Sequence, residues 1–484
     1  MEKHQADIGL IGLAVMGQNL ALNILDHHYQ VIVFNRTVEK VDQFLNDAAK
    51  GTKMMGATSL KDFFTKLKRP RKVIFMVKAG QPVDDLIKEC FPYLEKGDLL
   101  IDGGNSHYLD TERRCKELEK HGIHYIGSGI SGGEEGARNG PSIMPGGHLE
   151  AWKLVKEIFQ AISAKSGSNE PCCDWVGSGG SGHYVKMVHN GIEYGDMQII
   201  CEGYSLLKNC LHLSYQELQS TFEKWNHTEL NSYLIEITSK IFGVKDSQDF
   251  LVEKILDVAG QKGTGKWTGI NALDLGIPVT LIIEAVFARS VSSFYEDRKA
   301  LSKHYPKPVV VHPFAKAEMI EKIRQALYAA KILSYAQGFM LMKAMSEEMK
   351  WELNLGSIAM MWRGGCIIRS QFLDKIKEAY KKDSHLKSFL YDDFFKNEIK
   401  KSISGLREAI KMGIDFGVPL PALSSALSFF DGMTTERLPA NLLQAQRDFF
   451  GAHTYERVDR KRGEFFHTNW TGTGGNVSSS TYNV

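Results

Sequence analysis

The segment DIGLIGLAVMGQNLALNIL, residues 7–25, decides the fold that this sequence predicts. Its apolar start is typical of a short buried strand, and its second half has the spacing of an amphipathic helix. Between them, Gly12, Ala14 and Gly17 form the pattern G-x-A-x-x-G, a dinucleotide-binding fingerprint with alanine in place of the middle glycine. A helix that begins at such a turn offers free N–H groups and a positive dipole end to a pyrophosphate, so the segment predicts a dinucleotide site.

The second expected strand, within YQVIVFNRT, indicates which dinucleotide binds. Sites for NAD usually end this strand with a carboxylate that binds the ribose 2′-hydroxyl and would repel a 2′-phosphate. This sequence instead has Asn35, Arg36 and Thr37 there. An arginine beside two neutral hydrogen-bonding side chains suits a phosphate, so the pattern favours NADP. The alternative is that Arg36 is only a solvated loop charge.

Three more expected strands, KVIFMV, LLI and HYIGSGI, are each followed by a glycine-containing loop. These loops are residues 78–80, 102–106 and 131–133. Because ligands bind beyond the carboxyl ends of the strands in an open parallel sheet, we expect Asn105 and Ser131 to face a ligand. The residues that follow, EEGAR at 134–138, are expected to form a salt-bridged turn.

A second informative segment is YVKMVHNGIEYGDM, residues 184–197, whose polar side chains recur at helical spacing. One face of the expected helix carries Lys186, His189, Asn190, Glu193 and Tyr194. The polar stripe of a surface helix rarely combines a potential base, a potential acid and three hydrogen-bonding partners, so this face indicates a reactive site. Gly191 and Gly195 each cost a helix about 1 kcal/mol relative to alanine, which suggests that another segment approaches the backbone closely.

From this helix onward the pattern is helical, with few strand signals. The expected architecture is an α/β dinucleotide-binding domain of the Rossmann type in residues 1–178, a large all-α domain in residues 179–439 and a C-terminal tail in residues 440–484. Segments near Trp225 and Trp362 resemble each other, which suggests an internal duplication. The end of the chain, FFHTNWTGTGGNVSSSTYNV, has the composition of a disordered tail, but its aromatic residues suggest that it docks.

Composition disfavours several classes of function. The nearly balanced charge, +2 in 484 residues, gives no reason to expect nucleic acid or an anionic membrane as a partner. The sequence shows neither an apolar run of eighteen residues nor a basic segment followed by an apolar one at its start, so a membrane span and a secretory signal are not expected. Seven cysteines without paired spacing fit a reducing cytosol and argue against a structural zinc site.

The stretch AGQKGTGKWT offers an alternative function, because Gly260–Lys266 fits the phosphate-binding pattern G-x-x-x-x-G-K. Trp267 stands where such a nucleotide site needs the serine or threonine that binds magnesium, so a kinase or NTPase is disfavoured. Lys262, Thr264 and the glycines still predict a turn that binds an anion.

Eight motifs, read in chain order, extend from the first expected strand into the tail. They are GLAVMGQNL, NRT, DGGNS, SGISGGEEGARNGPSIMPGG, KMVHNGIEYGDMQ, GQKGTGKWT, EAVFAR and QAQRDFFGAHTYER. This set resembles the decarboxylating 6-phosphogluconate dehydrogenases of the pentose phosphate pathway, within the β-hydroxyacid dehydrogenase superfamily. The resemblance implies a cytoplasmic homodimer that converts 6-phospho-D-gluconate and NADP into D-ribulose 5-phosphate, CO2 and NADPH without a metal ion.

The resemblance also implies which residues bind each ligand. The positions that match the substrate site are Asn105, Ser131, Gly132, Gly133, Lys186, His189, Asn190, Glu193, Tyr194, Lys262, Thr264 and Arg289, with Arg447 and His453 supplied by the tail of the other subunit. The positions that match the cofactor site are Gly12, Leu13, Ala14, Val15, Met16, Gly17, Asn35, Arg36, Thr37, Val77, Lys78, Ala79 and Asn105. This sequence differs from many relatives at one position of the tail, where it has Thr473 and they carry histidine.

The implied chemistry needs a base and an acid from the expected helix. Lys186 would take the hydroxyl proton while a hydride leaves, and its ammonium would then stabilise the charge that develops as CO2 departs. A free lysine has a pKa of about 10.4, so burial or nearby cations must lower the pKa of this amine. Glu193 would donate a proton to the carbon that lost CO2, while His189 and Asn190 would orient the substrate.

Two alternatives remain from the sequence. A β-hydroxyacid dehydrogenase that does not decarboxylate would share the fingerprint and the lysine helix, but it would not need a set of phosphate-binding residues. A non-catalytic NADP-binding regulator would bind the dinucleotide without reducing it.

Overall fold

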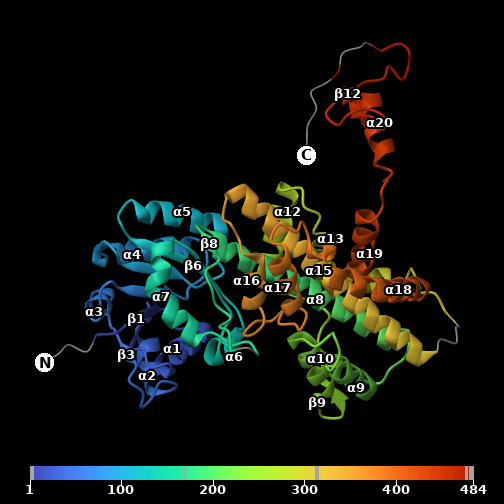
Figure 1. Ribbon diagram of the computed structural model, residues 1–484. Helices are drawn as coiled ribbons and strands as arrows, with labels where there is room; N and C mark the ends of the chain where they lie inside the picture. Colours follow the sequence, from blue (N-terminus) through green and yellow to red (C-terminus); the bar gives the residue numbers. More distant parts are fainter. Residues whose placement is uncertain (1–4, 168, 311–314, 475–477, 479–484) are drawn as a thin grey trace. The chain divides into compact units, whose positions relative to one another are not determined.

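The computed structural model describes residues 5–167, 169–310, 315–474 and 478. The chain divides into two compact units, Met1–Ala426 and Leu427–Val484, and Figure 1 labels the elements of both. Within the described ranges, none of the helices combines the length and the apolar character that crossing a membrane requires.

An eight-stranded sheet forms the centre of the N-terminal part of the first unit, with the strand order β3-β2-β1-β4-β5-β6-β7-β8. The strands are β1 (Ile8–Ile11), β2 (Val31–Phe34), β3 (Met55–Gly56), β4 (Lys72–Phe75), β5 (Leu99–Asp102), β6 (His124–Ile130), β7 (Ile143–Gly147) and β8 (Gly177–Ser178). Neighbouring strands are parallel except β6 and β7, which pair antiparallel. The predicted α/β fold class of this part is confirmed.

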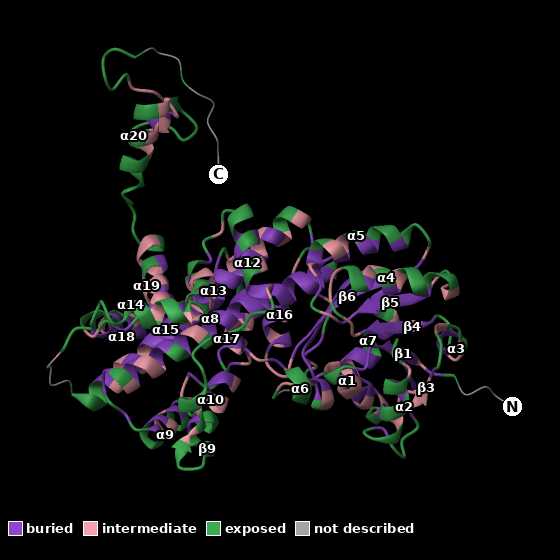
Figure 2. Cartoon of the chain, turned by 180° about the vertical axis from the view of Figure 1, so that it is seen from behind, coloured by how far each residue is buried: buried purple, intermediate pink, exposed green. Residues whose placement is uncertain are grey.

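Side chains of the central strands alternate between two apolar cores, because successive residues of a strand point to opposite faces. In β2, Val31 and Val33 pack into one core, and Ile32 and Phe34 pack into the other. Helices therefore cover both faces, and the strands β1, β2 and β5 are buried along their length (Figure 2). The helices between the strands are α1 (Val15–Asp26), α2 (Glu39–Asn46), α3 (Leu60–Thr65), α4 (Gln81–Cys90), the 3₁₀ turn η1 (Phe91–Tyr93), α5 (Tyr108–Glu119), α6 (Gly133–Asn139) and α7 (Leu149–Ile162).

The strand order reverses between β1 and β4, which pair parallel with each other. The fingerprint turn follows β1 and the loop Val77–Ala79 follows β4. Both loops therefore lie at the topological switch point, where open α/β sheets bind their ligands.

Long helices dominate the rest of the first unit. Helix α8 (Ser181–Asn209) packs against α15 (Lys316–Met349), and α15 packs against α18 (Asp393–Asp415). The apolar middle of α15 is buried in protein, where Lys331 forms an ion pair with Asp196 of α8. The other helices are α9 (Tyr215–Trp225), α10 (Tyr233–Gly243), α11 (Leu251–Lys254), α12 (Thr264–Asp274), α13 (Thr280–Ser293), α14 (Tyr295–Leu301), α16 (Leu355–Met361), α17 (Leu373–Lys382), the 3₁₀ turn η2 (Phe389–Tyr391) and α19 (Pro421–Met433).

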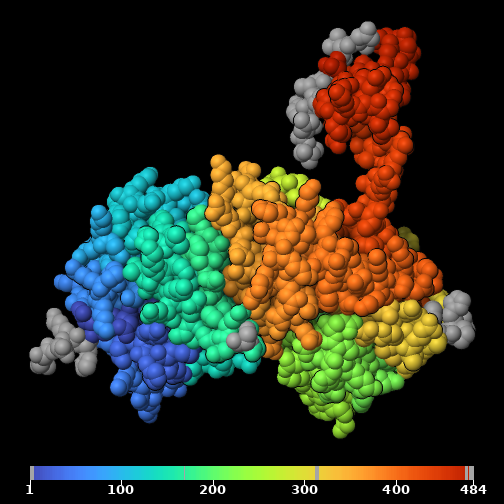
Figure 3. All heavy atoms as spheres, viewed as in Figure 1, coloured from blue at the N-terminus to red at the C-terminus, as the bar shows by residue number. Residues whose placement is uncertain are grey.

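A short antiparallel pair, β9 (Lys245–Asp246) with β10 (Asp249–Phe250), interrupts the helices. Together with α9 and α10 it forms one lobe, green in Figure 3. The part after residue 178 is helical apart from such short pairs, as the sequence predicts.

The prediction of a salt-bridged turn at residues 134–138 is wrong. These residues belong to the helix α6, and Arg138 pairs with Asp26 at the end of α1 rather than with a neighbouring glutamate. The helix forms because Ala137 packs into the apolar interior beside α1, a tertiary contact that the local sequence does not reveal.

The two resembling segments meet each other in the structure. Trp225 ends α9 and Trp362 follows α16, and after each tryptophan the chain passes through a serine before the next helix. These two serines, Ser232 and Ser370, form an antiparallel bridge. The internal duplication itself stays a prediction.

The second unit contains α20 (Ala440–Gly451) and the antiparallel pair β11 (Tyr455–Glu456) with β12 (Phe465–Phe466). The buried carboxylate of Asp448 organises it by accepting hydrogen bonds from the backbone N–H groups of Thr454 and Thr468 and from the indole N–H of Trp470. The end of the chain, as far as residue 474, therefore packs against α20 of its own unit. Of the residues beyond 474, only 478 lies within the described ranges.

Candidate active site

The predicted polar face lies on α8, and the structure encloses it in protein. Lys186, His189 and Asn190 are 6%, 0% and 8% exposed, and the side chain of Glu193 is 22% exposed. The first half of α8 packs on β6 and β7, and α12, α13 and α15 surround its middle. This enclosure gives the polar side chains a common interior environment.

The two glycines of α8 lie where other segments approach its backbone, as expected. A Cβ atom at Gly191 would stand 2.8 Å from Cγ2 of Thr268 in α12. One at Gly195 would stand 2.6 Å from Oγ of Ser334 in α15. Any larger residue would separate the helices that enclose the site.

The imidazole of His189 is the centre of the polar group. Its Nδ1 lies 3.5 Å from Nζ of Lys186, 3.1 Å from Oδ1 of Asn190 and 3.9 Å from the carboxylate of Glu193. Its Nε2 lies 3.3 Å from Oγ of Ser131, at the end of β6. The sheet and the helical part thus both contribute to one group.

Burial shifts the pKa values of the base and the acid toward each other. It lowers the pKa of the Lys186 amine, although the nearby Glu193 carboxylate opposes this shift. It raises the pKa of Glu193, against the opposing influence of Lys186, Arg289 and Lys262. Burial, together with the charge of Lys186, also lowers the pKa of His189 well below its usual value. A lowered lysine pKa favours loss of its proton and a raised carboxyl pKa favours keeping one, so the two groups suit proton transfer.

A second group forms around Tyr194. The guanidinium of Arg289 stacks on its ring, with Cζ 3.5 Å from the ring centroid, and donates a hydrogen bond to the carbonyl oxygen of Gly260. The backbone N–H of Lys262 lies 3.4 Å from the Tyr194 hydroxyl. Helix α12 begins at Thr264, two residues after Lys262, and its free N–H groups together with the charges of Lys262 and Arg289 suit an anion.

The loops after β5 and β6 differ in exposure. Asn105 is exposed, and Ser131 is buried. Gly132 and Gly133 both have positive φ, and a Cβ atom at Gly132 would stand 2.6 Å from the carbonyl oxygen of Gly365. Backbone from the helical part thus touches the loop that carries Ser131, which requires glycine there.

The predicted cofactor residues surround the switch point, and their geometry fits a dinucleotide. No side chain caps the N-terminus of α1, and its N-cap Ala14 and first residue Val15 are exposed. A Cβ atom at Gly12 would stand 2.5 Å from the carbonyl oxygen of Met76, which holds the turn close to the loop after β4. The remaining residues of this set are Leu13, Met16 and Gly17 in the turn and helix, and Val77, Lys78 and Ala79 in the neighbouring loop.

The three residues after β2 have different roles in the structure. The side-chain oxygen of Asn35 accepts a hydrogen bond from the backbone N–H of Leu13, and its NH₂ group donates to the carbonyl oxygen of Thr37. Asn35 therefore fixes the relative position of two loops. The side chains of Arg36 and Thr37 are exposed, where a phosphate could reach them.

Two predicted residues, Arg447 and His453, belong to the second compact unit. Arg447 donates a hydrogen bond to Gln444, and the ring of His453 packs edge-on against Phe450. Their contribution to the site of another subunit stays a prediction.

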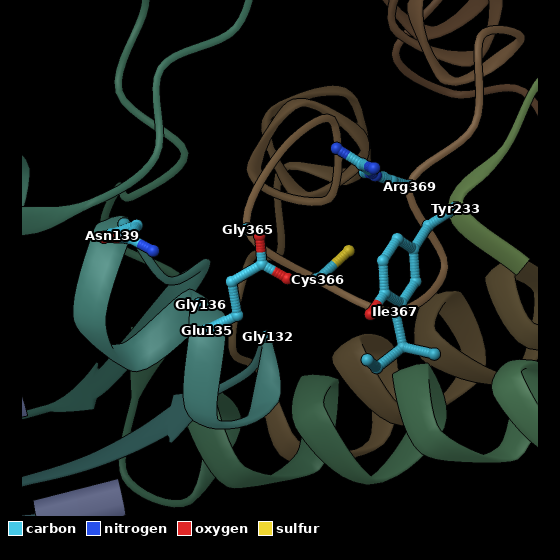
Figure 4. A pocket seen from close by; sticks show the side chains of 10 residues that line it. Gly132, Glu135, Gly136, Asn139, Tyr233, Gly365, Cys366, Ile367 and Arg369 are labelled. Atoms are coloured by element: carbon cyan, nitrogen blue, oxygen red, sulfur yellow. The ribbon is translucent and has the colours of Figure 1, made fainter. Parts of the chain in front are cut away.

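The segment near Trp362, which the sequence marked as one half of a duplication but not as part of the site, also reaches this region. The ring of Trp362 packs against His189, and the thiol of Cys366 is close enough to influence the pKa of Lys186. A cavity of about 140 Å³ lies between α6, Tyr233 and residues 365–369, and Figure 4 shows side chains that line it. The only sequence signal for this contact is the double glycine in WRGGC. Among the described side chains, His, Cys, Asp and Glu form no group of three or more suited to a metal ion.

Two family models match most of the chain. Residues 7–177 match the NAD binding domain of 6-phosphogluconate dehydrogenase, and residues 182–470 match the C-terminal domain of 6-phosphogluconate dehydrogenase.

Full-length relatives support the same assignment. The chain is 60% identical over 481 residues to the decarboxylating 6-phosphogluconate dehydrogenase of Haemophilus influenzae, covering 99% of each chain. It is 60% identical over 482 residues to the mouse enzyme of that name, covering 99% of this chain and 100% of the relative. A solved 6-phosphogluconate dehydrogenase from Plasmodium falciparum, described in its apo form and in complexes with NADP+ and with 6-phosphogluconate, superposes with a TM-score of 0.93 at 46% identity, covering 96% of this chain and 100% of that one.

Proposed function

The chain belongs to the 6-phosphogluconate dehydrogenase family, and from this premise we propose that it catalyses the NADP-dependent oxidative decarboxylation of 6-phospho-D-gluconate. The products are D-ribulose 5-phosphate, CO2 and NADPH. The observation that carries the proposal for the site is the enclosed face of α8, where Lys186 and Glu193 have oppositely shifted pKa values.

Lys186 is the proposed base of the oxidation step. Bound NADP+ supplies the hydride acceptor, and the substrate hydroxyl must lose its proton as the hydride leaves. Burial favours the neutral amine of Lys186, which can take that proton. His189 contacts the amine, and Ser131 and Asn190 contact the imidazole of His189; together they orient the hydroxyl groups and the carboxylate of the substrate.

The same lysine assists the loss of CO2. Once protonated, the ammonium stands beside the new ketone and stabilises the negative charge that develops on its oxygen. This interaction gives the lysine the role that a metal ion has in other decarboxylases, and we propose that the reaction is metal-independent. Glu193, whose raised pKa keeps a proton available, then protonates the carbon that lost CO2.

The group around Tyr194 is the proposed site for the phosphate end. Arg289 and Lys262 supply positive charge, and Thr264 opens a helix whose free N–H groups attract anions. Phosphate recognition at this point would distinguish the sugar acid phosphate from smaller hydroxy acids.

We further propose a homodimer in which Arg447 and His453 of one subunit complete the site of the other. Helix α13 leaves Phe287 and Val291 more than half exposed, and Phe294 directly after it is 58% exposed. These side chains follow one helical stripe, an arrangement that favours association with another protein surface. A cytoplasmic location fits the free state of all seven cysteines, and the proposed domain limits remain residues 1–178, 179–439 and 440–484.

The proposal is tested by mixing the protein with NADP+ and 6-phosphogluconate in the presence of a chelator, while NADPH absorbance and trapped CO2 are measured in parallel. Equal amounts of NADPH and CO2 are expected. NADPH without CO2 would instead indicate a dehydrogenase that does not decarboxylate. If dinucleotide binds but neither product forms, the protein is a non-catalytic NADP-binding regulator.

A further inference from the structure

The exposed side chain of Asn105 lies on a loop in which the residues before and after it donate hydrogen bonds to one buried carboxylate. Oδ1 of Asp102, at the end of β5, accepts a hydrogen bond of 3.0 Å from the backbone N–H of Gly104. Oδ2 of the same residue accepts a hydrogen bond of 2.6 Å from the hydroxyl of Ser106. Asp102 is 0% exposed and also accepts a hydrogen bond from the Tyr125 hydroxyl. The position of Asn105 therefore depends on Asp102.

The charge of Asp102 is balanced by Arg114 of α5, which is 1% exposed and lies 3.4 Å from Oδ2. The same guanidinium donates to the carbonyl oxygen of Gly80 at 3.0 Å and to both carboxylate oxygens of Asp84 at 2.9 and 3.0 Å. Gly80 ends the loop that carries Val77, Lys78 and Ala79. One side chain thus joins the loop after β4 to the loop after β5.

These two loops also touch directly. A Cβ atom at Gly104 would stand 3.1 Å from the carbonyl oxygen of Val77. One loop contains proposed cofactor residues and the other contains the proposed substrate residue Asn105. Small shifts between the loops would therefore change the distance over which a hydride moves.

We propose that Arg114 and Asp102 are positioning residues, which hold the cofactor loop and Asn105 in the relative arrangement that hydride transfer requires. Neither side chain reaches the substrate, so both act through the loops that they bind. The inference rests on the proposed function of the site. A buried carboxylate that loses its partner is strongly unfavourable, so the pair keeps both loops in one arrangement.

The chain offers a matched control at the opposite end of the same two strands. Arg71 precedes β4 and Asp98 precedes β5, and their buried side chains form an ion pair of 2.9 Å. Asp98 also accepts a hydrogen bond from the backbone N–H of Arg71. This pair ties together the amino ends of β4 and β5, away from the ligand-binding edge of the sheet.

The experiment compares Asp102→Asn with Asp98→Asn by steady-state kinetics, in parallel with urea unfolding. Both variants should lose stability. Asp102→Asn should lower kcat/KM for 6-phosphogluconate by about 10- to 100-fold, since a misplacement of 1 Å can cost 10²-fold, whereas Asp98→Asn should stay within about twofold of the wild type. Equal kinetic losses in the two variants would overturn the inference. A wild type without any NADPH production would instead contradict the proposed function.

A double variant tests whether Asp102 acts through Asn105. If it does, Asp102→Asn combined with Asn105→Ala should be about as impaired in kcat/KM as Asn105→Ala alone. Multiplied losses would mean that Asp102 does not act through Asn105, which would overturn that part of the proposal. If Asp102→Asn does not fold, Ser106→Ala tests the inference instead, because it removes the hydrogen bond from Ser106 to Asp102 without leaving a buried charge unpaired. It should raise KM for 6-phosphogluconate about threefold or more, and an unchanged KM would overturn the inference.

Discussion

Nζ of Lys186 lies 3.5 Å from Nδ1 of His189, and both side chains are buried on one face of α8. Two nitrogen bases at this distance cannot both be protonated at low cost. The lowered pKa of His189 assigns it the neutral state, so the imidazole can hold and orient the lysine amine without competing for its proton.

Replacing Lys186 with methionine keeps most of the length and the apolar body of the side chain but removes the base. Lys186→Met should lower kcat by at least about 10²- to 10⁴-fold, the usual contribution of a general base. Binding of NADPH, measured by fluorescence, should be retained. Lys153→Met, at an exposed lysine of α7, serves as the control and should leave turnover unchanged. Undiminished NADPH production by Lys186→Met would exclude this lysine as the base.

Glu193→Gln should separate oxidation from the later protonation step. The variant should form NADPH in a rapid first turnover and then turn over about 10²-fold or more slowly, because no acid protonates the intermediate. It should also move the rising limb of the pH profile of kcat/KM to lower pH, since removing the carboxylate removes an influence that raises the pKa of Lys186. Rapid mixing at several pH values measures both effects, and wild-type steady turnover would rule out this role.

Arg36→Ala tests the expected contact with the 2′-phosphate of NADP. A hydrogen bond to a charged group contributes about 1.5–3 kcal/mol, so kcat/KM for NADP should fall roughly 10- to 100-fold. The value for NAD should change little, because NAD lacks the phosphate. Lys50→Ala, at another exposed cation of the same domain, controls for a general loss of positive charge. Parallel losses with both dinucleotides would show that Arg36 does not recognise the phosphate.

Mixing two inactive variants tests the shared site. In a hybrid dimer of Lys186→Met and Arg447→Ala subunits, one site would combine an intact Lys186 with an intact tail from the other subunit. Co-refolding equal amounts should therefore restore about a quarter of wild-type activity if subunits pair at random. If the tail serves its own subunit, every site contains one defect, and no activity returns.

Titration of Glu202 should make the free energy of unfolding depend on pH. This buried residue of α8 accepts hydrogen bonds from the backbone N–H groups of Ala422 and Leu423 at the start of α19, and burial raises its pKa to about 7. Because the folded state keeps a proton that the unfolded state releases above its ordinary pKa of 4.5, the contribution of Glu202 to the free energy of unfolding falls as pH rises from 4.5 through 7.

Glu202→Gln removes this titration. The difference in free energy of unfolding, variant minus wild type, should therefore be larger at pH 8 than at pH 5, as measured by urea unfolding. Glu217→Gln is the control, because the pKa of Glu217 is lowered to about 2 and its titration lies outside this range. A difference between wild type and Glu202→Gln that stays constant with pH would contradict the assignment.

Local sequence determined much of this protein. The apolar run before Gly12 and the helical periodicity after it predict the first strand, turn and helix. Position 12 must be glycine, because a Cβ atom there would collide with the carbonyl oxygen of Met76. The 3.6-residue period alone places Lys186, His189 and Glu193 on one face of α8. The close approach to Gly191 and Gly195 was also predictable, since a glycine within a helix is unfavourable unless a neighbour requires it.

Tertiary structure decided what these residues contact. The same polar face on a solvent-exposed helix would keep ordinary pKa values, and only packing between the sheet and the long helices supplies the burial that shifts them. Trp362, Cys366 and Arg114 reach the site or its loops from other parts of the chain, and no local pattern shows which residues they contact. Periodicity is a property of neighbours in sequence, whereas desolvation and loop positioning depend on segments that meet only when the chain folds.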